Sequence, residues 1–531
     1  MKNTSIRVAR RAGAALLALA GLTAGATGQT EALQPNWSFQ SDGSWLPGVV
    51  SLGNAGTQVF TEIGSFSTHR LLLSGYDQDP PSPVWSDGSE MLHFHQVVDS
   101  ADTSDVHVVL VQEQPIGLPY RRAVLRKYTS ASADPDWEYV FDVDVYNHPY
   151  ASVKVSKDGT RIVGVVHDTS TNRAVVAVFD AANQQPQQVF NVDTFGPYQQ
   201  LSLSEDGTTL ALRSSQKLSV VSLDGGETVD SVFIIGGAYY GALDVSADGQ
   251  RVATSSGQKV SVYERGAQGL GLIREIQLGA YAYTYAVDLS EDGERLAYGR
   301  NDTQQPGRAE VRLEIVETGA RLIDFVQPGT GEFYNKVGHL ELSSDGGTLA
   351  AGLAGDGTGA HPEVLVFSAG SDVPQASFDT PGTVLALDLS HDGRALAIGA
   401  REGHSSVFGG GGGYYFIDTC SADLSLTGVP SVGSTVRFGQ QAMAGTPTRL
   451  LYASALAAEP RVFGSTGTLY LSEGSLSVLP GVAVADGNGV AKTDYSIPNS
   501  STLIGTSVYF QGLGMRPRQL TEDYVKMTIL P

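Results

Sequence analysis

The chain has 531 residues, of which 56 are acidic and 34 are basic, so its formal net charge is −22. Such an acidic surface repels nucleic acids and anionic membranes, which excludes both classes of partner. With 41% hydrophobic and 17% charged residues, the composition is typical of a soluble folded protein. The length exceeds what one compact core usually holds, so we expect at least two domains.

Residues 1–28 have the pattern of a secretory signal peptide. Four basic residues lie between positions 2 and 11, and an Ala/Leu-rich run from Ala12 to about Ala26 ends in small residues. This run is shorter than the roughly 20 residues that cross a bilayer, so we expect cleavage after Ala26 or Gly28 rather than membrane insertion. The pattern predicts a secreted bacterial protein, located in the periplasm or outside the cell.

One phrase recurs along the chain: aliphatic-Ser-x-Asp-Gly-x-x-aliphatic-small. It occurs at 155–163, 203–211, 245–253, 289–297, 342–350 and 389–397, with 42 to 53 residues between successive glycines. A period near 40 to 50 residues indicates a β-propeller or a solenoid. Long helical patterns are missing from this region, which excludes the helical solenoids.

The repeat at 285–327 shows how one unit is built. Four short alternating segments within it predict four strands, which make one propeller blade. In the turn between the first two strands, Asp292 can accept backbone hydrogen bonds, Ser290 can tighten the loop and Gly293 can supply a positive φ. Because six copies of one aspartate cannot all be the active residue, we interpret the phrase as structural.

Two weaker copies, at 50–60 and 91–112, extend the repeat toward the N-terminus. They bring the count to eight blades, or to seven if the first pair only completes the last blade. The last repeat reaches a third strand at 414–420 without an obvious fourth. We expect an N-terminal strand to supply it and close the ring, which removes exposed sheet edges.

The phrase resembles the WD40-like propeller repeats of exported bacterial proteins, including the TolB and YVTN types, over residues 35–418. The resemblance implies an all-β propeller that serves as a binding platform, a scaffold or, less often, an enzyme. Residues 421–531 lack the phrase and have short alternating strands near ten residues apart, which predicts a β-sandwich. This segment resembles the immunoglobulin-like C-terminal modules of secreted bacterial proteins.

Several histidines and aspartates could be metal ligands, but ordinary structural roles explain them as well. His93 and His95 are two apart on a predicted strand but have no third ligand at a recognisable spacing. Asp142 and Asp144 are expected on one face of a strand, and Asp356 lies in a glycine-rich loop. Neither pattern matches a calcium-binding loop, so we expect no cofactor and leave calcium as an alternative without an assigned ligand.

No catalytic motif is evident. The glycine-rich stretch 407–416 lacks the Lys-Ser/Thr of a phosphate loop, so we interpret it as a surface loop. Cys420, the only cysteine, cannot form an intramolecular disulfide, and we expect a packed thiol. The four tryptophans all precede residue 140, which argues against the repeated docking motif of a quinone-dependent propeller enzyme. We therefore assign no catalytic or cofactor-binding residue.

These observations favour an exported, monomeric, non-enzymatic propeller that binds a protein or a glycan at its rim or central channel. Tyr239, Tyr240, Tyr281, Tyr283 and Tyr285 precede successive first strands and are candidates for an aromatic surface, although blade packing explains them as well. The alternative is an enzyme of the lactonase or hydrolase type with a metal in the channel. Three or more carboxylates or histidines converging there would favour it. A structural surface-layer role is the third hypothesis.

Overall fold

The structure is a computed structural model, and it describes residues 31–531 apart from a set of gaps. The gaps are 34–36, 41–47, 54–57, 66–67, 76–82, 89–91, 115–120, 144–150, 195–197, 215, 225–228, 235–240, 306, 330–334, 357–358, 405–410, 420–423, 442–444, 464–467, 486–489, 516–517 and 522–524. The predicted signal peptide lies outside the described residues. Among the residues described, no helix is long and apolar enough to cross a membrane.

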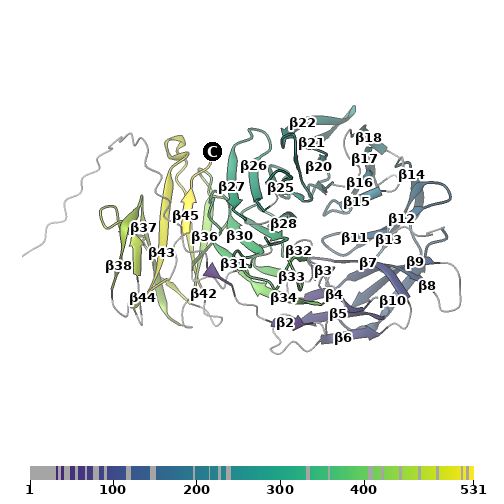
Figure 1. The fold of residues 1–531 in the computed structure, drawn as a ribbon, viewed down its shortest axis with the longest axis horizontal. Coiled ribbons are helices and arrows are strands. Elements are labelled where there is room, and N and C mark those ends of the chain that lie inside the picture. The colour runs from purple at the N-terminus through teal and green to yellow at the C-terminus, as the bar shows by residue number, and fades with distance from the viewer. Residues whose placement is uncertain are drawn as a thin grey trace, which may run out of the picture.

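The described chain is almost entirely β-structure (Figure 1). Eight sheets lie between Glu31 and Asp418, and we number them by their order along the chain. The first holds β3 (Val50–Gly53), β4 (Gln58–Ser65), β5 (Thr68–Gly75) and β6 (Pro83–Gly88). The second holds β7 (Leu92–Ser100), β8 (His107–Gln114), β9 (Arg122–Thr129) and β10 (Ser132–Val140). The third holds β11 (Ala151–Val155), β12 (Arg161–Asp168), β13 (Arg173–Asp180) and β14 (Gln188–Val192). The fourth holds β15 (Tyr198–Leu203), β16 (Thr209–Ser214), β17 (Lys217–Ser222) and β18 (Val229–Phe233).

The later sheets follow the same order with small additions. The fifth holds β19 (Leu243–Val245), β20 (Arg251–Ser256), β21 (Lys259–Gly266) and β22 (Gly269–Gln277). The sixth holds β23 (Ala282–Tyr283), β24 (Val287–Leu289), β25 (Arg295–Asp302), β26 (Ala309–Ile315) and β27 (Arg321–Gln327). The seventh holds β28 (Val337–Leu342), β29 (Thr348–Leu353), β30 (Val364–Ser368), β31 (Ala376–Phe378) and β1 (Glu31–Ala32). The eighth holds β32 (Val384–Leu389), β33 (Ala395–Arg401), β34 (Gly412–Asp418) and β2 (Trp37–Gln40).

Neighbouring strands within each sheet are antiparallel, except that β1 pairs parallel to β31 at the edge of the seventh sheet. The four strands predicted within 285–327 are β24, β25, β26 and β27, and that prediction is confirmed. The expected N-terminal strand is also confirmed, because β2 pairs antiparallel with β34 as the fourth strand of the eighth sheet. The parallel fifth strand β1 was not predicted.

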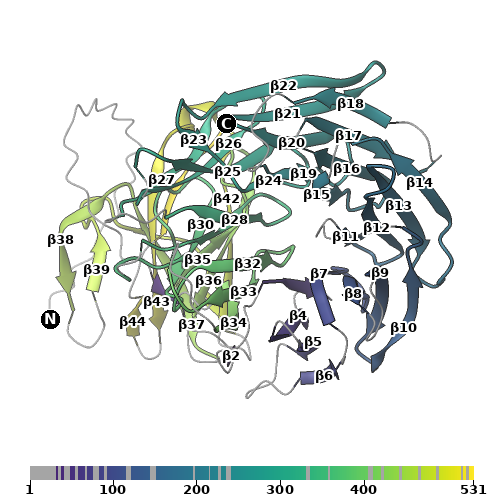
Figure 2. The same cartoon turned by 45° about the vertical axis from the view of Figure 1, so that its right-hand side comes forward.

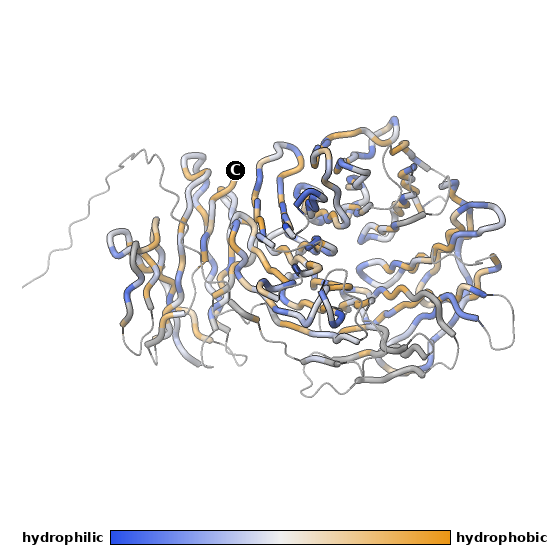
Figure 3. The backbone as a smooth tube through the Cα atoms, in the orientation of Figure 1, coloured by the Kyte–Doolittle hydropathy of each residue, from blue (hydrophilic) through white to orange (hydrophobic). Residues whose placement is uncertain are grey.

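The eighth sheet lies against the first, so the sheets are arranged in a ring (Figure 2). The backbone N–H of Leu52 donates to Asp388 Oδ2 at 2.6 Å across this junction. Leu52 and Val59 also share a buried core with Ala397 and Phe416. Apolar segments lie along the strands of the ring, as Figure 3 shows, and their side chains fill the spaces between adjacent sheets.

The Ser-x-Asp-Gly turns have the geometry that the sequence predicts. Ser290 Oγ donates to Asp292 Oδ1 at 2.6 Å and accepts the N–H of Arg295 at 3.0 Å, while Asp292 Oδ1 accepts the N–H of Glu294 at 2.9 Å. Gly293 has a φ of +65°, which an L-residue rarely adopts. The same bonds recur at Ser156, Ser204, Ser246, Ser343 and Ser390.

The strands after Asp418 form three further sheets. One holds β35 (Leu424–Thr427), β36 (Thr435–Gln441) and β42 (Val490–Ser496). A second holds β37 (Pro447–Ala453), β40 (Ser477–Val478), β41 (Ala483–Val484), β43 (Ser507–Met515), β44 (Arg518–Leu520) and β45 (Val525–Thr528), and the third pairs β38 (Leu456–Val462) with β39 (Thr468–Leu471). A short 3-10 helix spans Ser501–Leu503. Phe438 of the first of these sheets packs on Phe510 of the second at 4.4 Å between ring centroids.

These C-terminal strands contact the seventh sheet of the ring. Ser368 Oγ donates to the carbonyl of Leu426 at 3.0 Å. Leu530 and Val429 pack into the core that includes Phe367 and Ala369. The C-terminal sheets therefore cover one side of the ring (Figure 1).

Candidate functional site

The inner strands of the eight sheets surround a cavity of about 240 Å³, which we call the channel. The second to eighth sheets each present two described positions to it, one in the inner strand and one in the turn that follows, and the first sheet presents the strand position. The walls carry eight carboxyl groups but only two lysines, so the channel is more acidic than the chain as a whole.

The strand position lies two residues before the serine in the six Ser-x-Asp-Gly repeats, and at the equivalent place in the first two sheets. It is occupied by Ser51, Asp99, Lys154, Ser202, Asp244, Asp288, Glu341 and Asp388, which we call the strand ring. The four aspartates of this ring each accept the backbone N–H of an inner-strand residue in the next sheet. These donors are Val155 at 2.7 Å, Leu289 at 2.9 Å, Leu342 at 2.5 Å and Leu52 at 2.6 Å. The aspartates of the strand ring therefore fasten neighbouring inner strands to one another.

Crowding of these carboxyl groups changes their acidity. Burial raises the pKa of Asp388 to about 7. Burial and the neighbouring Asp244 raise the pKa of Asp288 well above its usual value, and burial and Asp388 do the same for Glu341. Lys154 is the only lysine of the strand ring. Its Nζ lies 3.0 Å from Asp99 Oδ1, and the charge of Asp99 raises the pKa of the lysine.

The turn position is the variable residue of Ser-x-Asp-Gly, and Asp102 holds the equivalent place in the second sheet, whose turn lacks that phrase. The described residues at this position are Asp102, Lys157, Glu205, Ala247, Glu291, Ser344 and His391, which we call the turn ring. Backbone hydrogen bonds link them around one mouth of the channel. Lys157 donates its N–H to the carbonyl of Glu205 at 3.0 Å, and Ala247, Glu291 and Ser344 each donate to the next turn-ring carbonyl at 2.9 to 3.1 Å.

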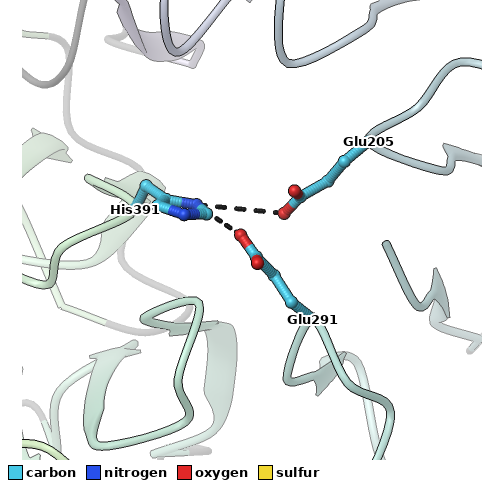
Figure 4. Close-up of side chains that lie close together, drawn as sticks. All are labelled: Glu205, Glu291 and His391. Carbon is cyan, nitrogen blue, oxygen red and sulfur yellow. Dashed lines mark ion pairs between the residues drawn. The ribbon is translucent and has the colours of Figure 1, made fainter. Parts of the chain in front are cut away.

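The charged side chains of the turn ring meet across this mouth. Lys157 Nζ lies 3.0 Å from Glu205 Oε2, 2.7 Å from Glu291 Oε1 and 2.5 Å from His391 Nε2. His391 Nδ1 lies 2.6 Å from Glu291 Oε1 and 3.8 Å from Asp102 Oδ2. Figure 4 shows His391, Glu205 and Glu291 pointing toward one another from three separate turns.

The two glutamates of the turn ring have different acidities. Burial and a hydrogen bond with Glu291 raise the pKa of Glu205 to about 8. Burial alone would raise the pKa of Glu291 too, but hydrogen bonds from Glu205 and Lys157 lower it. At neutral pH, therefore, the Glu205–Glu291 pair holds one proton, and the ammonium of Lys157 lies beside the remaining negative charge.

Glu205, Glu291 and His391 each place one potential ligand atom within 4.8 Å of the others, and they are the only such group of three found among the described residues. Oxygen and imidazole ligands of this kind suit zinc and similar divalent ions. The ammonium of Lys157 lies between the same atoms, at the place that a shared metal ion would take. In this arrangement the ammonium of Lys157, and not a metal ion, supplies the positive charge between Glu205, Glu291 and His391.

None of the candidate metal ligands from the sequence is among the described residues that line the channel. The prediction that Asp142 and Asp144 share one strand face is wrong, because β10 ends at Val140 and Asp142 is exposed beyond it; Asp144 lies outside the described residues. His93 and His95 are both in β7, and the pairing of β7 with β8 shifts register between them. Asp356 is buried and belongs to no metal-binding group that the described residues form.

The remaining candidates are only partly described. Cys420, Tyr239 and Tyr240 lie outside the described residues, as does the stretch 405–410 within the glycine-rich segment. Tyr281 is 61% exposed. Tyr283 packs edge-on against Tyr285 with 5.1 Å between ring centroids, so these two contribute to packing as well as to the surface.

Sequence reasoning did not identify either ring. The strand-ring aspartates carried a recognisable signal, the Asp-aliphatic-Ser order in 244–246, 288–290 and 388–390. The turn ring had a weaker signal. Its residues occupy the one position that varies within an otherwise regular turn. From the sequence such a position is interpreted as solvent-exposed, because only the ring of sheets shows that these residues meet.

No family model and no curated protein matches the chain. Solved structures do resemble it. Sqt1 from Chaetomium thermophilum aligns with a TM-score of 0.51 and 15% identity, over 73% of this chain and 99% of the Sqt1 chain. A chain from a crystal structure of the mitotic checkpoint complex aligns with a TM-score of 0.43 and 14% identity, over 78% of this chain and 99% of that chain. With the all-β architecture of four-stranded antiparallel sheets, the likeness to Sqt1 shows a WD40-like β-propeller fold.

Proposed function

We propose that this protein is an exported β-propeller of the bacterial cell envelope that binds a protein or a glycan at its channel. Residues 35–418 would form a closed eight-bladed ring, and residues 421–531 a β-sandwich that serves as an accessory or attachment module. The signal-like N-terminus supports export, and the eight consecutive sheets with the contact between the first and eighth support the ring. The WD40-like fold supports a scaffold or protein-interaction role.

The turn ring is the observation that carries this proposal. Serine, aspartate and glycine of each repeat are committed to the turn, whereas the residue between serine and aspartate is free to vary and meets its counterparts from the other blades. Five ionisable side chains from five sheets thereby form one composite polar surface. Their accessible fractions, 25% to 31%, leave them within reach of a ligand. Loops that several blades bring together on a rigid scaffold are the usual place for binding.

Site-specific cross-linking tests the proposal. Ala247 and Ser344 are the uncharged members of the turn ring, so a photoreactive amino acid at either position leaves the ionic network intact. We expect both probes, in intact cells, to capture the same partner, and the purified pair to bind with a measurable Kd. A probe at Ser231 on the exposed outer strand β18 is the matched control. The proposal fails if the turn-ring probes capture nothing, or only what the Ser231 probe captures.

The channel enzyme is the second candidate, because three potential ligands do converge there. The position of Lys157 speaks against a resident metal, since an ammonium and a divalent ion cannot share that place. Metal analysis of the purified protein, paired with thermal melts with and without chelator, distinguishes the two. A stoichiometric metal and a lower Tm on chelation would favour the enzyme, whereas a metal-free protein with an unchanged Tm supports the binding protein.

A further inference from the structure

Four neighbouring members of the strand ring are acidic. The fifth to eighth sheets each place one carboxyl group in the channel, from Asp244, Asp288, Glu341 and Asp388, which we call the acidic arc. None of the four forms an ion pair with a described lysine, arginine or histidine, and Lys154, which pairs with Asp99, lies four sheets from Glu341. The gaps at 54–57, 235–240, 330–334, 357–358 and 405–410 contain no lysine, arginine or histidine.

Glu341 is the one member of the acidic arc whose carboxyl group makes no hydrogen bond with a described residue. Asp244, Asp288 and Asp388 each accept the backbone N–H of the next inner strand. Glutamate is one methylene longer than aspartate, so at the same strand position its carboxyl group reaches farther into the channel. Glu341 lies deep in the protein but keeps a partly accessible surface where it lines the channel. Its carboxyl group is therefore within reach of a ligand that can replace the missing partner.

The arrangement of the arc suits an ammonium group better than a metal ion. A metal ion needs several ligand atoms around one point, and no three carboxylates of the arc bring their oxygens within 4.8 Å of one another. The channel already holds two ammonium groups beside carboxylates, those of Lys154 and Lys157, and no arginine is among its described lining residues. An ammonium group has three N–H donors and can bond to oxygens on several sides.

Two sheets of the arc have small residues at the turn mouth. Ala247 lies three residues after Asp244 in the fifth sheet, and Ser344 lies three residues after Glu341 in the seventh. The charged side chains of the turn ring come from five other sheets. Three strand residues span at most about 10 Å, so an ammonium group that enters here must be carried on an alkyl chain to reach the arc.

We propose that the acidic arc binds a primary ammonium group on an alkyl chain, with Glu341 as its main partner. The inference rests on the proposed function and deepens it, because the group is then a lysine side chain of the partner protein that enters through the turn mouth. A free alkylamine has the same chemistry, and the experiment below distinguishes the two sources.

Binding of a cation here should release protons. Burial raises the pKa of Asp388 to about 7, and burial and neighbouring carboxylates raise the pKa of Asp288 and Glu341, so part of the arc is protonated at neutral pH. A bound ammonium favours the ionised carboxylates, and a group of pKa 7 that ionises on binding makes binding about tenfold tighter at pH 8 than at pH 6. The other charged groups of the channel that face the arc are Asp99, Asp102, Lys154, Lys157, Glu205, Glu291 and His391.

Isothermal titration calorimetry of the full-length protein with Nα-acetyl-lysine methylamide tests the site. Nα-acetyl-norleucine methylamide has the same chain without the ammonium group, and we expect it not to bind. The lysine amide should bind about tenfold more tightly at pH 8 than at pH 6. Glu341→Gln should weaken its binding about tenfold, because the variant keeps the shape of the side chain but loses a charged acceptor. Glu317→Gln is the matched control, since Glu317 is 72% exposed and lies outside the channel lining.

Four results would each overturn the inference: no binding of the lysine amide, equal binding of the norleucine amide, unchanged affinity in Glu341→Gln, or displacement of the lysine amide by one Ca²⁺ per chain. Cross-linking at Ala247 and Ser344 separates this inference from the proposed function. A captured partner whose yield neither the lysine amide nor Glu341→Gln reduces would leave the proposed function standing and contradict this site. Binding of the lysine amide without any captured partner would support the site, with a free amine as its ligand, and contradict the proposed function.

Discussion

Replacing Lys157 with methionine tests the balance of charges in the turn ring. Methionine keeps the length and apolar part of the side chain but removes the ammonium that lies 3.0 Å from Glu205 and 2.7 Å from Glu291. A hydrogen bond to a charged group contributes about 1.5–3 kcal/mol, and two that share one donor group do not add fully. Because Lys157 is only 25% exposed, solvent screens the loss incompletely. We expect a destabilisation of about 2–3 kcal/mol at pH 9.

The loss should depend on pH. Glu205 has a pKa of about 8, so above that pH both glutamates are ionised, and the lysine ammonium lies within 3.0 Å of each of them. At pH 6 Glu205 is protonated, one negative charge is gone, and we expect a smaller loss. Urea unfolding followed by tryptophan fluorescence measures the effect. Trp137 stacks on Phe179 of the next sheet and donates its indole N–H to the carbonyl of Ala181 at 3.0 Å, so it reports on the ring.

Lys259→Met is the matched control, because its ion pair with Glu275 is exposed and should contribute less than about 1 kcal/mol. A Lys157→Met stability within about 0.5 kcal/mol of the wild type at pH 9, or a loss of stability equal at both pH values, would refute the reasoning.

The smaller Lys157→Ala variant also removes the side chain that lies between Glu205, Glu291 and His391. We expect it to bind one Zn²⁺ per chain by isothermal titration calorimetry at concentrations where the wild type binds none.

Three further outcomes follow from the channel and the turns. Asp388→Ala should destabilise the ring by about 1–3 kcal/mol in urea unfolding, because it leaves the buried N–H of Leu52 without an acceptor. Stability should fall as the pH rises from 6 to 9, because Glu205 and Asp388 bind their protons more tightly in the folded state than in the unfolded chain; Glu205→Gln should make this part of a Tm-against-pH profile less steep. Gly249→Ala should lower the Tm, because its φ is +67° and a Cβ would lie 2.2 Å from Thr209 Oγ1, a strain of at least about 1–2 kcal/mol.

Each of these has a control in the same chain. Asp388→Asn keeps an oxygen for the N–H of Leu52 and removes a charge from a crowded ring, so it should unfold close to the wild type. Gly474→Ala should leave the Tm unchanged, because its Cβ meets only the Ser472 hydroxyl at 3.8 Å. An Asp388→Asn variant as unstable as Asp388→Ala would contradict the role of the carboxylate as an acceptor. A wild-type Tm that does not change between pH 6 and 9 would contradict the inference that Glu205 binds its proton more tightly in the folded state.

The sequence alone was sufficient for the local features of the fold. A Ser-x-Asp-Gly turn is completed by bonds that reach at most five residues along the chain, as between Ser290 and Arg295, so its residues specify it wherever the ring places it. The four-strand unit and the N-terminal strand that pairs with β34 followed from the same repeat. A local pattern misled where strand-like alternation continued past a real strand end, at Val140.

The tertiary structure decided which side chains meet. Lys157 and His391 are 234 residues apart and lie 2.5 Å from each other only because the sheets close into a ring. Within its own repeat each turn-ring residue is a half-exposed position with no local partner, so the sequence shows neither the opposing charge nor the crowding that raises the pKa of Glu205. The same holds for Lys336 and Tyr285, which precede the neighbouring inner strands β28 and β24 and meet with 4.4 Å between the ammonium and the ring centroid. Charge interactions depend on distance through space, and ring closure sets that distance independently of separation along the chain.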